Sequence, residues 1–117
     1  CLRYLEHVPE EDLQPLFHQA KVFAFPSLHE GFGLPVLEAY ASGIPVVTSR
    51  AGSIPEVAGE AAILADPLDP ASLAAALRLC LEDRITAQRL AAEGRRRAAL
   101  FTWERTARLT ADVYRNT

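Results

Sequence analysis

Short apolar runs alternate with helically spaced apolar positions in the first half of the chain. The runs predict strands at residues 2–5, 22–25, 45–48 and 61–64. Helical spacing between the runs predicts helices over residues 10–20 and 35–42 and a short helix that starts at Ser53. This alternation indicates an α/β fold with a parallel sheet and helices on both faces. The continuous apolar character of the strands agrees, because parallel strands are buried on both sides.

Proline, glycine and hydroxyl residues mark the expected ends of these helices. Pro35 fits the first turn of a helix, and Gly43 fits its end. Ser53 and Glu56 have the spacing of a capping box, in which the serine hydroxyl would accept a hydrogen bond from the first turn.

The second half of the chain is helical. Asp69 is expected to cap a first helix, with Pro70 in its first turn, and Thr102 is expected to cap the last helix. A middle helix is expected over residues 85–100, with an interruption at Gly94. No repeat or linker divides the chain, so we expect one α/β unit that ends in C-terminal helices.

Composition excludes several classes of protein. The 117 residues include 12 basic and 15 acidic side chains, and the net charge of −3 argues against a nucleic-acid-binding protein. No apolar run is long enough for a transmembrane helix, and the N-terminus lacks the pattern of a signal peptide. The basic residues concentrate at Arg95, Arg96 and Arg97, which indicate either a solvated helix face or contact with an anionic membrane surface or partner.

The two cysteines, Cys1 and Cys80, lie far apart and lack C-x-x-C spacing, so neither a zinc site nor a disulfide framework is expected. Cys80 is interpreted as a small apolar core residue, and the setting as a reducing cytoplasm. The chain contains no methionine and begins at Cys1, which indicates a processed chain or a piece of a longer one.

The loop before the helix at residues 35–42 carries the candidate chemistry. Ligands of open α/β sheets bind at this carboxyl edge of the strands. Gly31 and Gly33 let the backbone approach a ligand closely. The backbone amides of Phe32, Gly33 and Leu34 lie at the start of the helix, where the helix dipole favours phosphate.

Two carboxylates flank these amides. Glu30 precedes them in the loop, and Glu38 lies about one turn inside the helix and points back toward its N-terminus. Carboxylates accept hydrogen bonds from paired hydroxyls, whereas a simple anion would be repelled by both glutamates. Phosphates between two hydroxylated rings, as in a nucleotide diphosphate sugar, would match. The alternative is that a glutamate in an early helical turn only complements the dipole.

Other polar residues in this region indicate no different chemistry. His29 is interpreted as a loop residue without a catalytic role. Ser49 and Ser53 have no nearby histidine and aspartate, so a hydrolase triad is not expected. Arg50 is either a phosphate contact or a surface residue.

The spacing of Glu30 and Glu38 resembles the E-x7-E signature of the retaining glycosyltransferases of family 4, or glycosyl transferases group 1, which have the GT-B fold. The similarity continues in order through nearly the whole chain, over residues 42–49, 52–57, 66–70 and 101–107. It implies a partial Rossmann-like, doubly wound parallel sheet, the second half of a GT-B C-terminal domain, followed by C-terminal helices.

The resemblance also implies roles for individual residues. Glu30, as the catalytic residue, would contact hydroxyls of the transferred sugar, and Glu38 would hold the ribose of the nucleotide. The remaining ligands of the sugar and the diphosphate would be backbone groups of Gly31, Phe32, Gly33 and Leu34. The donor would be a UDP-, GDP- or ADP-sugar, and transfer would proceed with retention and without a metal ion. Residues 4–7 would lie beside the base, although Glu6 stands where the family usually has glycine.

By the same resemblance, residues 1–117 would be the C-terminal portion of the nucleotide-sugar-binding domain, without the acceptor domain and the first half of this domain. The complete protein would transfer a hexosyl group to a glycan, lipid or small-molecule acceptor, in the cytoplasm or at the inner face of the membrane, and this chain alone would be inactive. The strand at residues 22–25 would present an open edge suited to self-association. The alternatives are a non-catalytic nucleotide-sugar-binding or assembly module and, disfavoured by the transferase-like motifs, a sugar-nucleotide epimerase.

Overall fold

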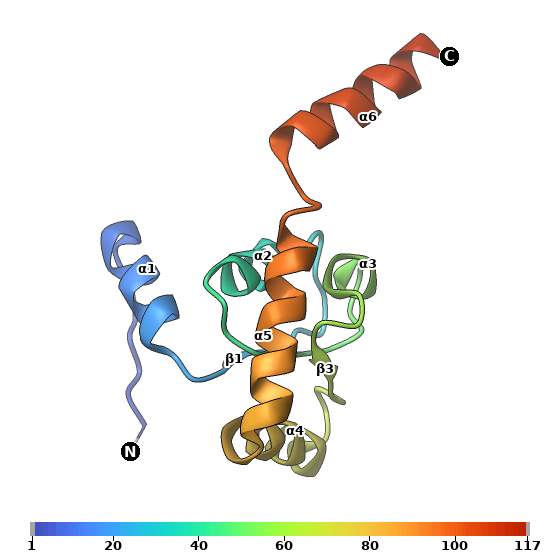
Figure 1. The fold of residues 1–117 in the computed structure, drawn as a ribbon. Coiled ribbons are helices and arrows are strands. Elements are labelled where there is room, and N and C mark those ends of the chain that lie inside the picture. The colour runs from blue at the N-terminus through green and yellow to red at the C-terminus, as the bar shows by residue number, and fades with distance from the viewer. Residues whose placement is uncertain (1, 117) are drawn as a thin grey trace.

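A parallel three-stranded sheet forms the centre of the computed structural model, which describes residues 2–116. Its strands are β1 (Phe23–Phe25), β2 (Val46–Thr48) and β3 (Ile63–Leu64), in the order β1-β2-β3. Ala24 lies opposite Val47, and Thr48 lies opposite Leu64. The predicted α/β fold with a parallel sheet and C-terminal helices is therefore confirmed (Figure 1).

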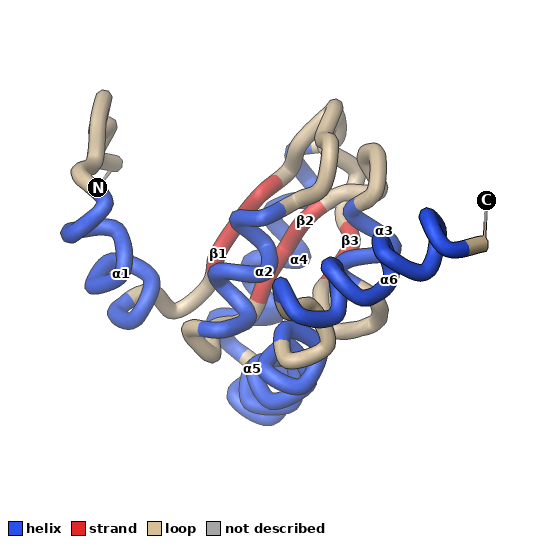
Figure 2. The backbone as a smooth tube through the Cα atoms, turned by 90° about the horizontal axis from the view of Figure 1, so that it is seen from above, coloured by secondary structure: helices blue, strands red, loops and turns tan. Residues whose placement is uncertain are grey.

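The described residues form six helices. They are α1 (Glu10–Gln19), α2 (Leu34–Ala41), α3 (Ile54–Ala58), α4 (Pro70–Glu82), α5 (Arg84–Ala98) and α6 (Trp103–Arg115). In Figure 2, α2 crosses in front of the strands and α4 lies behind them. The predicted caps of α4 and α6 are confirmed, since Asp69 accepts a hydrogen bond from Ala71 N and Thr102 accepts one from Arg105 N.

Successive residues of β2 face two separate cores. Val46 packs in a cluster with Tyr40 of α2 and Ile54 of α3. Val47 packs in a second cluster with Cys80 of α4 and Leu90 of α5. The prediction that Cys80 is a core residue is confirmed, and burial raises the pKa of its free thiol.

β1 is less buried than its apolar sequence predicts. Phe23 and Phe25 are half-buried and pack against the cluster that contains Phe17 of α1, whereas Ala24 is exposed. Within residues 2–116, β1 pairs only with β2. Its other edge is therefore open in this structure.

Residues 2–5 form no strand, so that prediction is wrong. Leu2 is 97% exposed, and Tyr4 is also largely exposed. The segment lies apart from the sheet, on the side of α1 (Figure 1). An apolar run becomes a strand only where a neighbouring strand completes its hydrogen bonds, and no described strand lies beside this one.

α5 runs across the amino edge of the sheet and connects the α4 layer with the α2 layer (Figure 1). The predicted interruption at Gly94 is wrong, because the helix is continuous through this residue. Gly94 is buried against the ring of Tyr40, and a Cβ atom there would lie 2.7 Å from Tyr40 Cδ1. The glycine permits close packing of two helices.

Arg95 and Arg97 of α5 contact the turns that lead into β2 and β3. The Arg95 guanidinium lies against Gly43. Arg97 Nε donates to the carbonyl oxygen of Val57 at 3.1 Å, and a second guanidinium N–H donates to the carbonyl oxygen of Glu56. Arg97 therefore caps the C-terminus of α3, so the solvated-face interpretation is wrong for Arg97, whereas the side chains of Arg95 and Arg96 are exposed.

Candidate functional site

Two loops lie together beyond the carboxyl ends of β1 and β2 (Figure 2). The β1–α2 loop contains Glu30 and both glycines of the predicted site. The β2–α3 loop covers residues 49–53. The site thus occupies the edge of the sheet where open α/β folds bind ligands.

Two buried hydroxyl groups at the end of β2 support the β1–α2 loop. Thr48 Oγ1 donates to the carbonyl oxygen of Phe25 at 2.7 Å, and Ser49 Oγ donates to the carbonyl oxygen of Ser27. Both side chains are fully buried, so each bond satisfies a hydroxyl that would otherwise be costly to bury. From the sequence, Ser49 is a candidate only for a hydrolase triad, which is not expected, and this supporting role is missed. The signal in the sequence for this role is the pair of hydroxyl residues, Thr48 and Ser49, that directly follows the apolar pair of a buried strand.

Gly52 and Ser53, the last two residues of the β2–α3 loop, reach the centre of the predicted site. Ser53 Oγ donates to the carbonyl oxygen of Gly31. The predicted capping box is therefore wrong, and α3 has no side-chain cap at its N-terminus. Gly52 has a φ of +53°, and a Cβ atom there would overlap the carbonyl oxygen of Glu30. Only glycine fits this position without a shift of the backbone.

Glu30 is half-buried in the β1–α2 loop. Ser27 Oγ lies 3.4 Å from Glu30 Oε2 and 3.1 Å from the carbonyl oxygen of His29. A serine hydroxyl has one proton, so it can donate to only one of these oxygens at a time. The carboxylate thus lies beside a loop hydroxyl and keeps capacity to accept further hydrogen bonds.

α2 begins without a side-chain cap. Gly33 is the N-cap residue, with a φ of +86° that favours glycine. No acidic side chain lies in the first turn, and Pro35 has no N–H to satisfy. The start of this eight-residue helix therefore presents backbone N–H groups and the positive end of the dipole.

Gly31 has space around it that the protein does not fill. Apart from its chain neighbours, no heavy atom lies within 4 Å of the position that a Cβ atom would take. Its φ is not among the positive values found at other glycines. The fold itself does not require glycine here, so the open space is available to a ligand.

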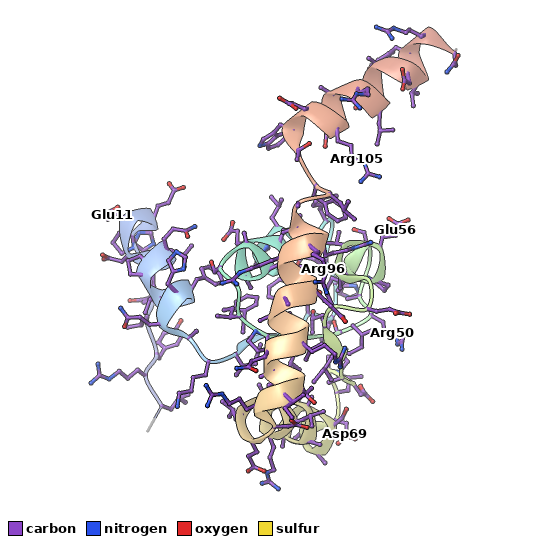
Figure 3. The ribbon with its side chains drawn as sticks, in the orientation of Figure 1. Glu11, Arg50, Glu56, Asp69, Arg96 and Arg105 are labelled. Carbon is purple, nitrogen blue, oxygen red and sulfur yellow. The ribbon has the colours of Figure 1, made fainter. Side chains whose placement is uncertain are left out.

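The side chains of Glu38 and Arg50 are both exposed. Glu38 is exposed on α2, one turn after the exposed Leu34, while Val36 and Tyr40 face the core. Residues four apart lie on one helix face, so Glu38 lies on the same face of α2 as Leu34, the first residue of the helix. Arg50 is exposed and points away from the molecule in Figure 3, as in the surface interpretation.

Phe32 directs its ring toward the joint between α5 and α6. It packs edge to face with Phe101 at a centroid distance of 6.1 Å, and the Arg97 guanidinium lies 5.4 Å from the centre of the Phe101 ring. These side chains line a pocket of approximately 310 Å³ together with Arg105 and Leu109. The ring of Phe32 is thus anchored on the side of the loop where α6 begins.

Two kinds of feature are absent from the described part of the chain. No group of three histidine, cysteine, aspartate or glutamate side chains within residues 2–116 could hold a metal ion. In the same part of the chain, no helix is both long enough and apolar enough to cross a membrane.

The chain resembles known proteins over nearly its full length. Residues 2–97 match the family described as Glycosyl transferases group 1. The chain is 42% identical over 114 residues to O-antigen chain mannosyltransferase B of Escherichia coli, a match that covers 97% of this chain and 30% of that protein. It is 41% identical over 115 residues to glycogen synthase of Mycobacterium tuberculosis, which covers 96% of this chain and 28% of that protein.

A solved structure supports the same relationship. Sucrose-phosphate synthase (tll1590) from Thermosynechococcus elongatus superposes with a TM-score of 0.84 and 34% sequence identity, over 97% of this chain and 29% of that protein. The chain therefore spans less than a third of the length of these relatives.

Proposed function

Because the chain belongs to the Glycosyl transferases group 1 family, we propose that it is the donor-binding part of a retaining glycosyltransferase. In this proposal, residues 1–117 are the C-terminal portion of a nucleotide-sugar-binding domain. The complete protein transfers a hexosyl group from a UDP-, GDP- or ADP-sugar to a glycan, lipid or small-molecule acceptor. The small share of the relatives that the chain covers supports a role as one part of such a protein.

The observation that carries the proposal is the uncapped start of α2 beside the open space at Gly31. Backbone N–H groups at a helix start bind phosphate, and a glycine without a side chain lets a ligand approach the backbone. The amides of Phe32, Gly33 and Leu34 are assigned to the diphosphate and to sugar hydroxyls. When the bond between the anomeric carbon and the diphosphate breaks, the diphosphate oxygen gains negative charge, which fixed dipoles stabilise without a metal ion.

The flanking carboxylates are assigned to the two hydroxylated ends of the donor. Glu30 accepts hydrogen bonds from hydroxyls of the transferred sugar and holds the ring beside the acceptor. Glu38 accepts hydrogen bonds from the ribose hydroxyls. The half-buried position of Glu30 and the shared face of Glu38 and Leu34 support this division.

The proposal includes a cytoplasmic location, at the inner face of the membrane where the acceptor is a lipid. The free, buried thiol of Cys80 supports a reducing compartment. The exposed side chains of Arg95 and Arg96 support contact with an anionic surface.

Donor titration of the complete protein that carries this chain tests the proposal. UDP-, GDP- and ADP-sugars are titrated by calorimetry into the parent and into the Glu30→Gln, Glu38→Gln and Gly31→Ala variants. We expect each change to weaken binding of the preferred donor by about tenfold or more. Gly31→Ala is the sharpest of the three, because the protein has room for the added methyl group and its thermal midpoint should not fall.

The outcomes separate the candidate functions. Parent-like donor binding in all three variants would contradict the site. Donor binding by the parent without any sugar transfer would favour the non-catalytic binding module.

A further inference from the structure

The carbonyl oxygens of two successive residues in the β1–α2 loop face the β2–α3 loop. The carbonyl of Gly31 accepts the hydrogen bond from Ser53. The carbonyl of Glu30 lies so close to Gly52 that a Cβ atom there would overlap it. In an extended segment successive carbonyls alternate in direction, so this arrangement is particular to the loop.

The direction of these carbonyls fixes the direction of two amides. A trans peptide unit is planar, and its C=O and N–H point in opposite directions. No described peptide bond is cis. The carbonyl of Glu30 belongs to the same peptide unit as the N–H of Gly31, and the carbonyl of Gly31 to the same unit as the N–H of Phe32. Both N–H groups therefore point away from the β2–α3 loop.

Two successive N–H groups that point to one side form a concavity that attracts an anionic or hydroxyl oxygen. The residue between them is Gly31, whose Cβ position is unfilled by protein atoms. The start of α2 continues the same run of unpaired donors at Leu34. For this concavity to exist before a ligand binds, both carbonyls must be held on the side of the loop that faces the β2–α3 loop.

We propose that Ser53 and Gly52 are positioning residues for the donor: Ser53 holds the Gly31 carbonyl and Gly52 leaves space for the Glu30 carbonyl, so that the Gly31 and Phe32 amides face the donor. This role rests on the proposed function. Ser53 and Gly52 touch the loop and not the donor, and they act through the orientation of the peptide units. Thr48 and Ser49 support the same loop nearer to the sheet.

The test uses the complete protein that carries this chain and compares Ser53→Ala with Ser42→Ala. Ser42 is a matched control because its Oγ also donates to a main-chain carbonyl, that of Glu38 at 3.0 Å, but at the opposite end of α2. Initial rates are measured against donor and against acceptor concentration, together with thermal midpoints. We expect Ser53→Ala to raise the KM for the donor about tenfold. The KM for the acceptor should stay at its parent value, and the thermal midpoint should fall no further than in Ser42→Ala.

Two more variants complete the design. Ser53→Thr keeps a hydroxyl and should restore the donor KM to within about twofold of the parent. Gly52→Ala should raise the donor KM more than Ser53→Ala does, because it displaces the Glu30 carbonyl directly.

An unchanged donor KM in Ser53→Ala would overturn the positioning role. So would a parallel loss of donor binding, acceptor binding and thermal stability, since that pattern indicates general unfolding. If Gly31→Ala loses donor affinity while Ser53→Ala does not, the proposed function stands and only the positioning role is wrong. If neither variant loses affinity, the assignment of the Gly31 and Phe32 amides to the donor is wrong as well, and the Glu30→Gln and Glu38→Gln titrations then decide whether the proposed function stands.

Discussion

Gly31, Gly33 and Gly52 lie within one site, and each is glycine for a different physical reason. Gly33 needs a left-handed backbone at the start of α2. Gly52 needs a positive φ and also space for a neighbouring carbonyl. Gly31 needs neither, and its open surroundings support a requirement imposed by a ligand. The sequence alone marks Gly31 and Gly33 but cannot separate these reasons, because the reason at Gly52 depends on a contact between distant segments.

Replacement of Gly33 should cost stability through backbone strain. The φ of +86° is unfavourable for alanine, while the nearest atom to an added Cβ, in Ile54, lies at an ordinary 3.5 Å. We expect Gly33→Ala to lower the free energy of unfolding by about 1–2 kcal/mol, measured by urea denaturation. Gly33→Asn should lose less, since asparagine tolerates this conformation better. An equal loss in Gly31→Ala would contradict this assignment, because Gly31 has no such backbone requirement.

At the scale of elements, α5 is the main contact between the two layers of helices. It packs on α4 near its start and on α2 near its end, and its arginines contact the turns before β2 and β3. Tyr40 is fixed in this arrangement, since its hydroxyl donates to the carbonyl oxygen of Ala58 at 2.9 Å. Burial raises the pKa of the Tyr40 phenol well above its usual range, and the positive charge of Arg97 partly opposes the shift. The tyrosine is therefore a neutral structural donor.

The close contact between α5 and α2 predicts an unusual response to a helix-favouring change. Gly94→Ala should raise helix propensity by about 1 kcal/mol, yet its Cβ would lie 2.7 Å from the fully buried ring of Tyr40. We expect overpacking to prevail and the free energy of unfolding to fall by roughly 1–3 kcal/mol in urea denaturation. Ala92→Gly, at an exposed position of α5, serves as the control and should lose about 1 kcal/mol by propensity alone. Stabilisation by Gly94→Ala would contradict the contact.

Local signals explain which elements the sequence predicts correctly. The caps at Asp69 and Thr102 depend on bonds to residues two or three positions away, and the structure contains both. Ser53 and Gly94 carry equally clear local signals, but their partners lie far along the chain. The long-range contact determined the outcome in both cases. The apolar run at residues 2–5 had no neighbouring strand to complete it.

For the whole molecule, the open edge of β1 has the largest consequence. Phe23 N donates to the carbonyl oxygen of Pro45 at 2.9 Å, so its N–H points toward β2. Because successive residues of a strand direct their N–H groups to alternate sides, the N–H of Ala24 points to the open edge. This donor is available to another strand, whether from a second copy of the chain or from further residues of a longer protein.

The open edge predicts that the 117-residue chain by itself self-associates. We expect sedimentation velocity to reveal a species larger than a monomer, and we expect Ala24→Pro to shift it toward the monomer. Proline removes only the outward N–H, and edge strands tolerate it. Ala24→Val retains the N–H and should associate like the parent. A parent chain that sediments as a monomer would rule out this form of association.

The position of the single tryptophan has a consequence for spectroscopy. Trp103 is the first residue of α6 and is 86% exposed, and no residue of that helix is buried. Its emission in the native chain should therefore already be that of an indole in water, and unfolding of the sheet should change it little. A shift of that emission to shorter wavelength would instead report that another surface has covered α6. Intrinsic fluorescence of this protein is thus a probe of assembly, and circular dichroism is the suitable probe of folding.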